Sequence, residues 1–148
     1  MDNAERREIV TACERLALDF AWHVDHRNIE EVVGLFTADA SFERKGEVLK
    51  GRSEIHAAQM KRPAGLVTRH VCANLRIDVV DPTHARGTHY FLLYRHDHAA
   101  AGTVASAPAP LAQPETLGEY SDEYLLTTDG WRISRRVAKA AFRRAVNP

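Results

Sequence analysis

The chain has 148 residues, with 20 Lys and Arg against 20 Asp and Glu, so its formal net charge is zero with histidine neutral. This length fits one domain, and 45% apolar with 27% charged residues is typical of a globular protein. The balanced charge argues against nucleic acid or an anionic membrane as the main partner, because both attract basic proteins. No apolar run is long enough to cross a membrane, and the N-terminal residues lack the apolar core of a signal peptide. We therefore expect a cytoplasmic protein.

The first part of the chain predicts three helices and two short strands. Apolar residues three or four positions apart, from Ile9 to Val24, predict an amphipathic helix over about 4–25. Asn28 can cap a second helix over IEEVVGLF, and Ser53 can cap a third from residue 54 to about 60. The two short strands are expected at 40–43 and 47–49, around a Lys-Gly turn.

The remainder of the chain predicts β-structure. Strands are expected from about 67 to 80, 85 to 95, 117 to 127 and 131 to 142, and short connections predict antiparallel pairing. The Ala- and Pro-rich stretch 98–116 reads as a long loop between two of them. The sequence thus predicts a single α+β domain over 1–148. Its three helices would pack in a curved antiparallel β-sheet that forms a cone with an internal pocket.

Four segments in order carry a resemblance to a known family: FAWHVDHRNIEEVVGLFTADASFE, KGRSEI, RHVCANLRI and DGWRISRR. Together they resemble the nuclear transport factor 2-like superfamily with its cystatin-like fold, and specifically its SnoaL-like branch, over about residues 5–142. That branch includes polyketide cyclases, scytalone dehydratase, bile-acid dehydratase and hexachlorocyclohexane dehydrochlorinase. Because one fold hosts many functions, the candidate site has to carry the functional argument.

Asp25 and His70 resemble the catalytic pair of the dehydratase and dehydrochlorinase members. Asp25 lies at the edge of the first helix's apolar stripe, where a half-buried carboxylate requires a hydrogen-bond donor. A strand histidine facing it would supply one, and the carboxylate would fix the imidazole tautomer and leave the other ring nitrogen free to take a proton. The alternative is that Asp25 only caps or pairs at a helix end and His70 is an interior histidine.

Strict alternation in the strand after residue 67 conflicts with this pair. It places the apolar residues 71, 73, 75, 77 and 79 on one face and His70 on the other. If the apolar face covered the helices, His70 would point outward. A β-bulge between His70 and Arg76 would turn His70 inward. Alternatively, the apolar face packs against a second subunit, and the superfamily resemblance implies a homodimer or homotrimer formed through the sheet.

The resemblance also implies a basic residue near the leaving group and an aromatic lining of the substrate pocket. Arg136 stands where some eliminating relatives carry a basic residue near the leaving group, and Arg135 is the alternative because neighbouring strand residues face opposite ways. Phe20 replaces a tyrosine of the dehydratase relatives, so a sheet tyrosine would have to take over its role. The aromatic residues expected to line the substrate pocket are Phe20, Trp22, Phe42, Tyr90, Tyr120 and Trp131.

These residues predict a cofactor-independent lyase or isomerase of the dehydratase, dehydrochlorinase or cyclase type, acting on a small hydrophobic cyclic molecule. Proton abstraction by an imidazole requires no cofactor, and no stretch of the sequence matches a three-ligand metal pattern. Two alternatives are a non-catalytic small-molecule-binding protein and a structural subunit resembling the β subunits of ring-hydroxylating dioxygenases.

Overall fold

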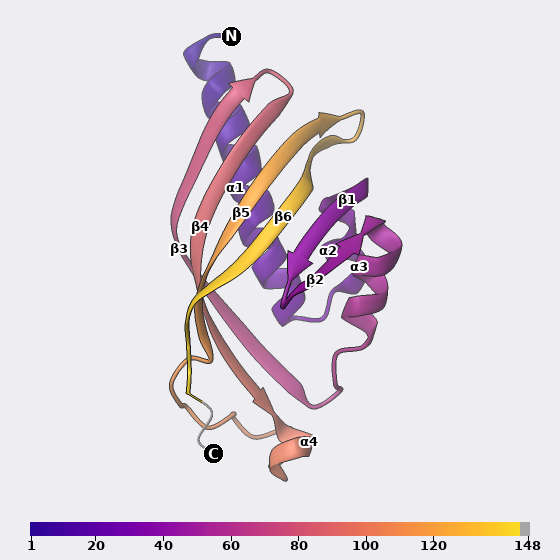
Figure 1. Ribbon diagram of the computed structural model, residues 1–148, viewed down its shortest axis with the longest axis vertical. Coiled ribbons are helices and arrows are strands. Elements are labelled where there is room, and N and C mark those ends of the chain that lie inside the picture. Colours follow the sequence, from indigo (N-terminus) through magenta and orange to yellow (C-terminus); the bar gives the residue numbers. More distant parts are fainter. Residues whose placement is uncertain (146–148) are drawn as a thin grey trace.

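The computed structural model describes residues 1–145 and shows a β-sheet curved around a long N-terminal helix (Figure 1). In chain order the described elements are α1 (Asn3–Asp25), α2 (Ile29–Gly34), β1 (Phe36–Arg44), β2 (Glu47–Lys50), α3 (Gly51–Met60), β3 (Leu66–Asp81), β4 (His84–Asp97), α4 (His98–Ala101), β5 (Thr116–Thr127) and β6 (Gly130–Arg143). The predicted α+β class and conical arrangement are confirmed, with α4 as an addition at the start of the long connection. No helix within 1–145 combines the length and apolar character needed to cross a membrane.

The six strands form one sheet in the order β2-β1-β6-β5-β4-β3. Four of the neighbouring pairs are antiparallel, but β1 and β6 run parallel, with Ser41 opposite Arg135. The prediction of a purely antiparallel sheet was therefore wrong. Short connections force antiparallel pairing only on strands that follow each other in the chain, whereas β1 and β6 are separated by enough chain for a crossover.

Two element boundaries differ from the sequence prediction for local reasons. Helix α3 begins at Gly51, so Ser53 lies inside the helix and does not cap it. The carboxylate of Glu54 instead accepts a hydrogen bond of 2.7 Å from the backbone N–H of Lys50, which closes the first turn. Strand β1 begins at Phe36, earlier than predicted, and α2 is correspondingly shorter.

Phe20 lies at the centre of the core and orients α1 against the sheet. Its side chain is 2% exposed and meets three rings edge-on, those of Phe36, Phe42 and Tyr120, at centroid distances of 5.9, 5.6 and 5.8 Å. Edge-to-face contacts of this kind add to the free energy gained by burying the rings. The packing fixes the rotation of α1 about its axis and thereby the direction in which Asp25, its last residue, faces the sheet.

A β-bulge in β3 decides which way His70 points. From Ala73 to Arg76 strand β3 advances three residues while its partner β4 advances two, so β3 contains one extra residue there. Asn74 adopts the left-handed region, with φ of 56°. Asparagine tolerates this conformation better than most residues.

The bulge reverses the alternation of β3. Upstream of it His70 faces inward, and Val71 is 51% exposed on the outer face. Downstream, Ile77 and Val79 pack against the core, although strict alternation would have placed them on the same face as Val71. The extra residue thus accounts for an inward His70 without the help of a second subunit.

We expect Asn74→Val to lower the free energy of unfolding by about 1–2 kcal/mol, because a β-branched residue is strained at positive φ. Asn74→Gly should change it by no more than about 0.5 kcal/mol. Urea denaturation followed by circular dichroism measures both values. Arg76→Val, at an exposed position of the same strand, is the matched control, and an equal loss in both valine variants would contradict a strained bulge.

Candidate active site

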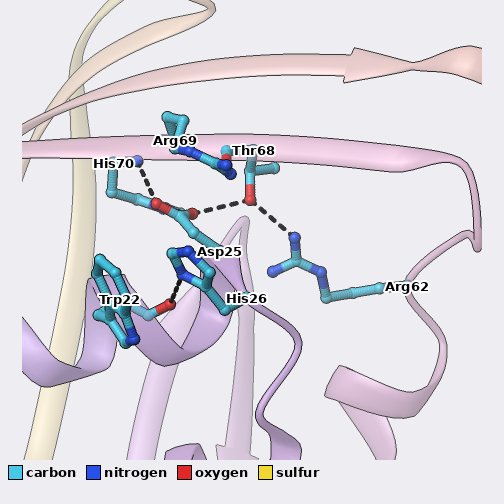
Figure 2. A network of polar contacts seen from close by, with 7 residues as sticks. All are labelled: Trp22, Asp25, His26, Arg62, Thr68, Arg69 and His70. Carbon is cyan, nitrogen blue, oxygen red and sulfur yellow. Dashed lines mark hydrogen bonds and ion pairs between the residues drawn. The ribbon is translucent and has the colours of Figure 1, made fainter. Parts of the chain in front are cut away.

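The structure brings Asp25 and His70 together where the end of α1 meets β3 (Figure 2). Asp25 ends α1 and His70 lies in β3, with Nδ1 of the imidazole 2.7 Å from Oδ1 of the carboxylate. The backbone N–H of His70 also donates to Oδ2 at 2.7 Å, and the hydroxyl of Thr68 donates to Oδ1 at 2.9 Å. The Asp25 side chain is 5% exposed and that of His70 is 8% exposed. A nearly buried carboxylate is therefore held by three donors from one strand.

The protonation state of Asp25 determines the tautomer of His70. Burial by itself raises the pKa of the Asp25 carboxyl, but the hydrogen bonds and charge of His70, with the Thr68 hydroxyl, outweigh it and hold the pKa below its usual 3.8. The ionised carboxylate can only accept hydrogen bonds, so Nδ1 of the neutral imidazole carries the hydrogen and Nε2 carries the lone pair. His70 lines a cavity, and no described residue is hydrogen-bonded to its Nε2.

Two arginines fix the chain around this pair. Nη2 of Arg62 donates to the Thr68 hydroxyl at 2.9 Å (Figure 2). Arg27, just after α1, donates to the carbonyl oxygens of Pro63 and Leu66, the latter at 2.9 Å. The segment between α3 and β3 is thereby tied to the end of α1. Sequence reasoning missed both arginines, because their partners are backbone or hydroxyl oxygens that no spacing rule identifies.

A cavity of about 820 Å³ opens beside His70. Its size falls within the usual range for small-molecule sites. Apolar side chains from α1, β1, β3, β4 and β5 form part of its lining: Phe20, Val24, Phe42, Leu66, Phe91, Leu93 and Tyr120. The imidazole thus borders a cavity whose lining is apolar in part and which is large enough to enclose a ring-containing molecule.

The aromatic residues predicted to line the pocket divide into two groups. Phe20, Phe42 and Tyr120 line the cavity; Trp22, Tyr90 and Trp131 do not. Trp22 is 59% exposed and stacks on His26 at a ring distance of 3.9 Å, on the outer side of α1 (Figure 2). Tyr90 is 46% exposed on the outer face of the sheet, and Trp131 packs against the core from the start of β6. Composition does not reveal which face of an element an aromatic residue occupies.

Arg136 faces the interior and Arg135 faces solvent, but Arg136 is not part of the cavity lining. Its fully buried guanidinium pairs with Asp122 through two hydrogen bonds of 2.7 Å. It also lies 4.3 Å from the ring centre of Phe20 and 4.4 Å from that of Tyr120. Arg136 therefore supports two rings of the cavity wall from behind, and this position does not favour direct contact with a substrate.

The Arg136–Asp122 pair belongs to a buried polar cluster with His89 and Tyr124. The Tyr124 hydroxyl donates to Asp122 at 2.9 Å, and Nδ1 of His89 lies 3.9 Å from the same carboxylate. Desolvation, then the charge of Arg136, lowers the pKa of His89 to about 4, so this imidazole is neutral at pH 7. Sequence analysis missed Asp122, although its position between two inward tyrosines at period two was a usable signal. Neither this cluster nor any other group of His, Cys, Asp and Glu in residues 1–145 is arranged to hold a metal ion.

Comparison with known families agrees with this fold. The family model of the SnoaL-like domain matches residues 5–137. The chain therefore belongs to the family of SnoaL-like domains, as its sequence resemblance indicated. No curated protein sequence matches it.

Solved structures with the same fold include enzymes and proteins of the nuclear transport factor 2-like type. A suggested scytalone dehydratase from Novosphingobium aromaticivorans superposes with a TM-score of 0.80 at 20% identity, covering 99% of this chain and 94% of that one. A hexachlorocyclohexane dehydrochlorinase, LinA type 2, gives 0.79 at 18% identity over 99% and 94%. A nuclear transport factor 2-like protein with a cystatin-like fold, from N. aromaticivorans, gives 0.72 at 18% identity over 93% and 87%.

We expect Asp122→Ala to lower the free energy of unfolding by about 3–5 kcal/mol, because it leaves the buried guanidinium of Arg136 without a counterion. The neighbouring pair Glu123–Arg135 provides the matched control. Its side chains are 55% and 50% exposed and 3.7 Å apart, so Glu123→Ala should cost less than about 1 kcal/mol. Urea denaturation of both variants makes the comparison, and similar losses would contradict a supporting role for the buried pair.

Proposed function

We propose that this chain is a cofactor-independent lyase or isomerase of the dehydratase, dehydrochlorinase or cyclase type. In this proposal His70 is the general base, Asp25 positions it, and the substrate is a small hydrophobic cyclic molecule with an acidic C–H next to a carbonyl or a leaving group. The hydrogen bond of 2.7 Å between Nδ1 of His70 and Asp25, at the wall of a cavity lined in part by aromatic and aliphatic side chains, is the observation that carries it.

The geometry supports a defined proton transfer. Nε2 of His70 takes the proton from the substrate carbon, and the electron pair of the C–H bond forms a C=C bond as the leaving group departs. The Asp25 carboxylate accepts the hydrogen bond from Nδ1–H throughout and stabilises the imidazolium that forms. In an isomerisation the same imidazolium returns the proton at another carbon. The similarity to a suggested scytalone dehydratase and to a dehydrochlorinase agrees with chemistry of this type.

One feature separates this chain from the dehydratase relatives it resembles. Phe20 stands where they place a tyrosine, so that hydroxyl is missing from the proposed site. Tyr120 is the tyrosine that lines the cavity, and burial raises the pKa of its hydroxyl, which therefore stays protonated. Tyr120 is the residue that we propose to donate a hydrogen bond to the substrate oxygen in its place.

We expect His70→Ala to slow proton abstraction by about 10²–10⁴-fold. A panel of cyclic β-hydroxyketones in D₂O tests it, because exchange of the proton next to the carbonyl is visible by NMR whether or not the leaving group departs. Asp25→Asn should reduce the rate by at least about tenfold, since an amide cannot stabilise the imidazolium as a carboxylate does.

The exposed pair Asp81–His84 supplies the control for this test. It has the same residue types 3.0 Å apart at the β3–β4 turn, with the side chains 45% and 55% exposed. His84→Ala and Asp81→Asn should leave exchange unchanged. Equal rates in wild type and His70→Ala, with both proteins folded, would contradict the proposal and favour a non-catalytic binding protein.

A further inference from the structure

Cationic side chains line a part of the cavity that the proposed function does not use. Of the described residues in its lining, eight are Lys or Arg and one, Glu115, is acidic. They come from the end of β1 and the turn after it, from the segment just after α3, from β4, and from β6 with the residue that follows it. Because the whole chain has equal numbers of acidic and basic residues, this is a local concentration of positive charge.

The basic residues are close enough to repel one another. Desolvation, followed by the charge of Arg95, lowers the pKa of Lys45. Arg44 and Arg143 act in the same direction, and Glu115 is the acidic group that opposes them. Like charges in a partly enclosed site raise the free energy of the folded state unless an anion neutralises them.

Arg62 connects this basic group to the dyad. Desolvation and the charge of Arg27, then that of Arg44, lower the pKa of Arg62. The same guanidinium donates to the hydroxyl of Thr68, which donates to Asp25 (Figure 2). The Arg62 guanidinium is therefore connected, through the Thr68 hydroxyl, to the carboxylate that orients His70. We call Arg44, Lys45, Arg62, Arg95 and Arg143 the basic cluster.

Two donors of the basic cluster have no acceptor within residues 1–145. The Nε–H groups of Arg44 and Arg62 are buried and without a hydrogen-bond partner. The ion pair of Arg44 with Glu47 is long, at 3.6 Å, and is made through Nη2. Buried donors without partners are costly, and guanidinium groups match the oxygens of carboxylates and phosphates. An anionic group in the cavity would supply the negative charge that these guanidinium groups lack.

We infer that the molecule bound in this cavity has an anionic substituent, a carboxylate or phosphate, which the basic cluster holds while the apolar ring lies against His70. This inference rests on the proposed function for the reaction but concerns binding alone. The sequence led us to expect a small hydrophobic ligand. The inferred ligand has an anionic group in addition, so its ring would contact the apolar residues of the cavity and its anion would contact the basic cluster.

Two fluorescent dyes with the same aromatic skeleton test the inference. 8-Anilinonaphthalene-1-sulfonate is anionic, and N-phenyl-1-naphthylamine lacks the sulfonate. Fluorescence titration at low ionic strength should show the anionic dye bound about tenfold more tightly, which equals about 1.4 kcal/mol. The preference should shrink at about 0.5 M salt, because the ions screen partly exposed charges.

Charge-removing variants locate the binding site. Arg44→Gln combined with Lys45→Gln should abolish the preference for the anionic dye and leave binding of the neutral dye unchanged. The matched control removes two exposed arginines of β3 and β4 outside the cavity lining, Arg76→Gln with Arg86→Gln, and should keep the preference. Displacement of the anionic dye by 2-naphthoate or by 2-naphthyl phosphate then distinguishes a carboxylate from a phosphate.

The outcomes separate this inference from the proposed function. Equal affinities of the two dyes, or equal effects of the two double variants, would overturn the anionic substituent even if His70 is a working base. A retained preference in His70→Ala, with no turnover of any ketone by the wild type, would support anion binding and count against the proposed reaction.

Discussion

The site depends on one carboxylate that joins a helix end to a strand. Asp25 accepts hydrogen bonds from the ring and the backbone of His70 and from Thr68, so α1 and β3 are fixed at a single point. A nearly buried carboxylate would be costly without these donors, and with them it stays ionised. The same contacts that stabilise the charge therefore set the tautomer and the direction of the imidazole.

Two further constraints make this contact possible. The edge-on packing of Phe20 sets the rotation of α1, and the extra residue at Asn74 turns the first half of β3 so that His70 faces the helix. Behind the cavity, the buried Arg136–Asp122 pair supports the rings of Phe20 and Tyr120. Aromatic packing, a backbone irregularity and a buried ion pair thus shape one cavity beside the imidazole of His70.

Much of this arrangement could be predicted from the sequence, and the exceptions have physical reasons. Periodicity identified α1 and the long strands because their apolar faces repeat at regular intervals. The parallel β1–β6 pair was missed because pairing between distant strands leaves no local signal. The direction of His70 depended on a one-residue bulge, which the sequence allowed but could not establish. Trp22 and Tyr90 were misplaced because an aromatic residue on an outer face resembles one on an inner face in composition.

Some of the site residues could likewise be predicted from the sequence, and others could not. Asp25 and His70 could be named from their place in the family pattern, whereas Asp122 and the basic cluster could not. The zero net charge of the chain gave no sign of the basic cluster, since a total conceals where the charges lie. Only the three-dimensional arrangement brings basic residues from the end of β1, the turn after it, the segment after α3, β4 and β6 to the lining of one cavity. Net charge is thus a guide to general solubility and poor evidence about a site.

The tautomer of His70 in the folded protein is the most direct test of this account. Long-range ¹H–¹⁵N NMR of uniformly labelled protein at neutral pH distinguishes which ring nitrogen carries the hydrogen. For the neutral form of the ring, the account predicts that the hydrogen is on Nδ1 and is shifted strongly downfield by its bond to Asp25. A ring protonated at Nε2 alone, or one exchanging freely between tautomers, would contradict it.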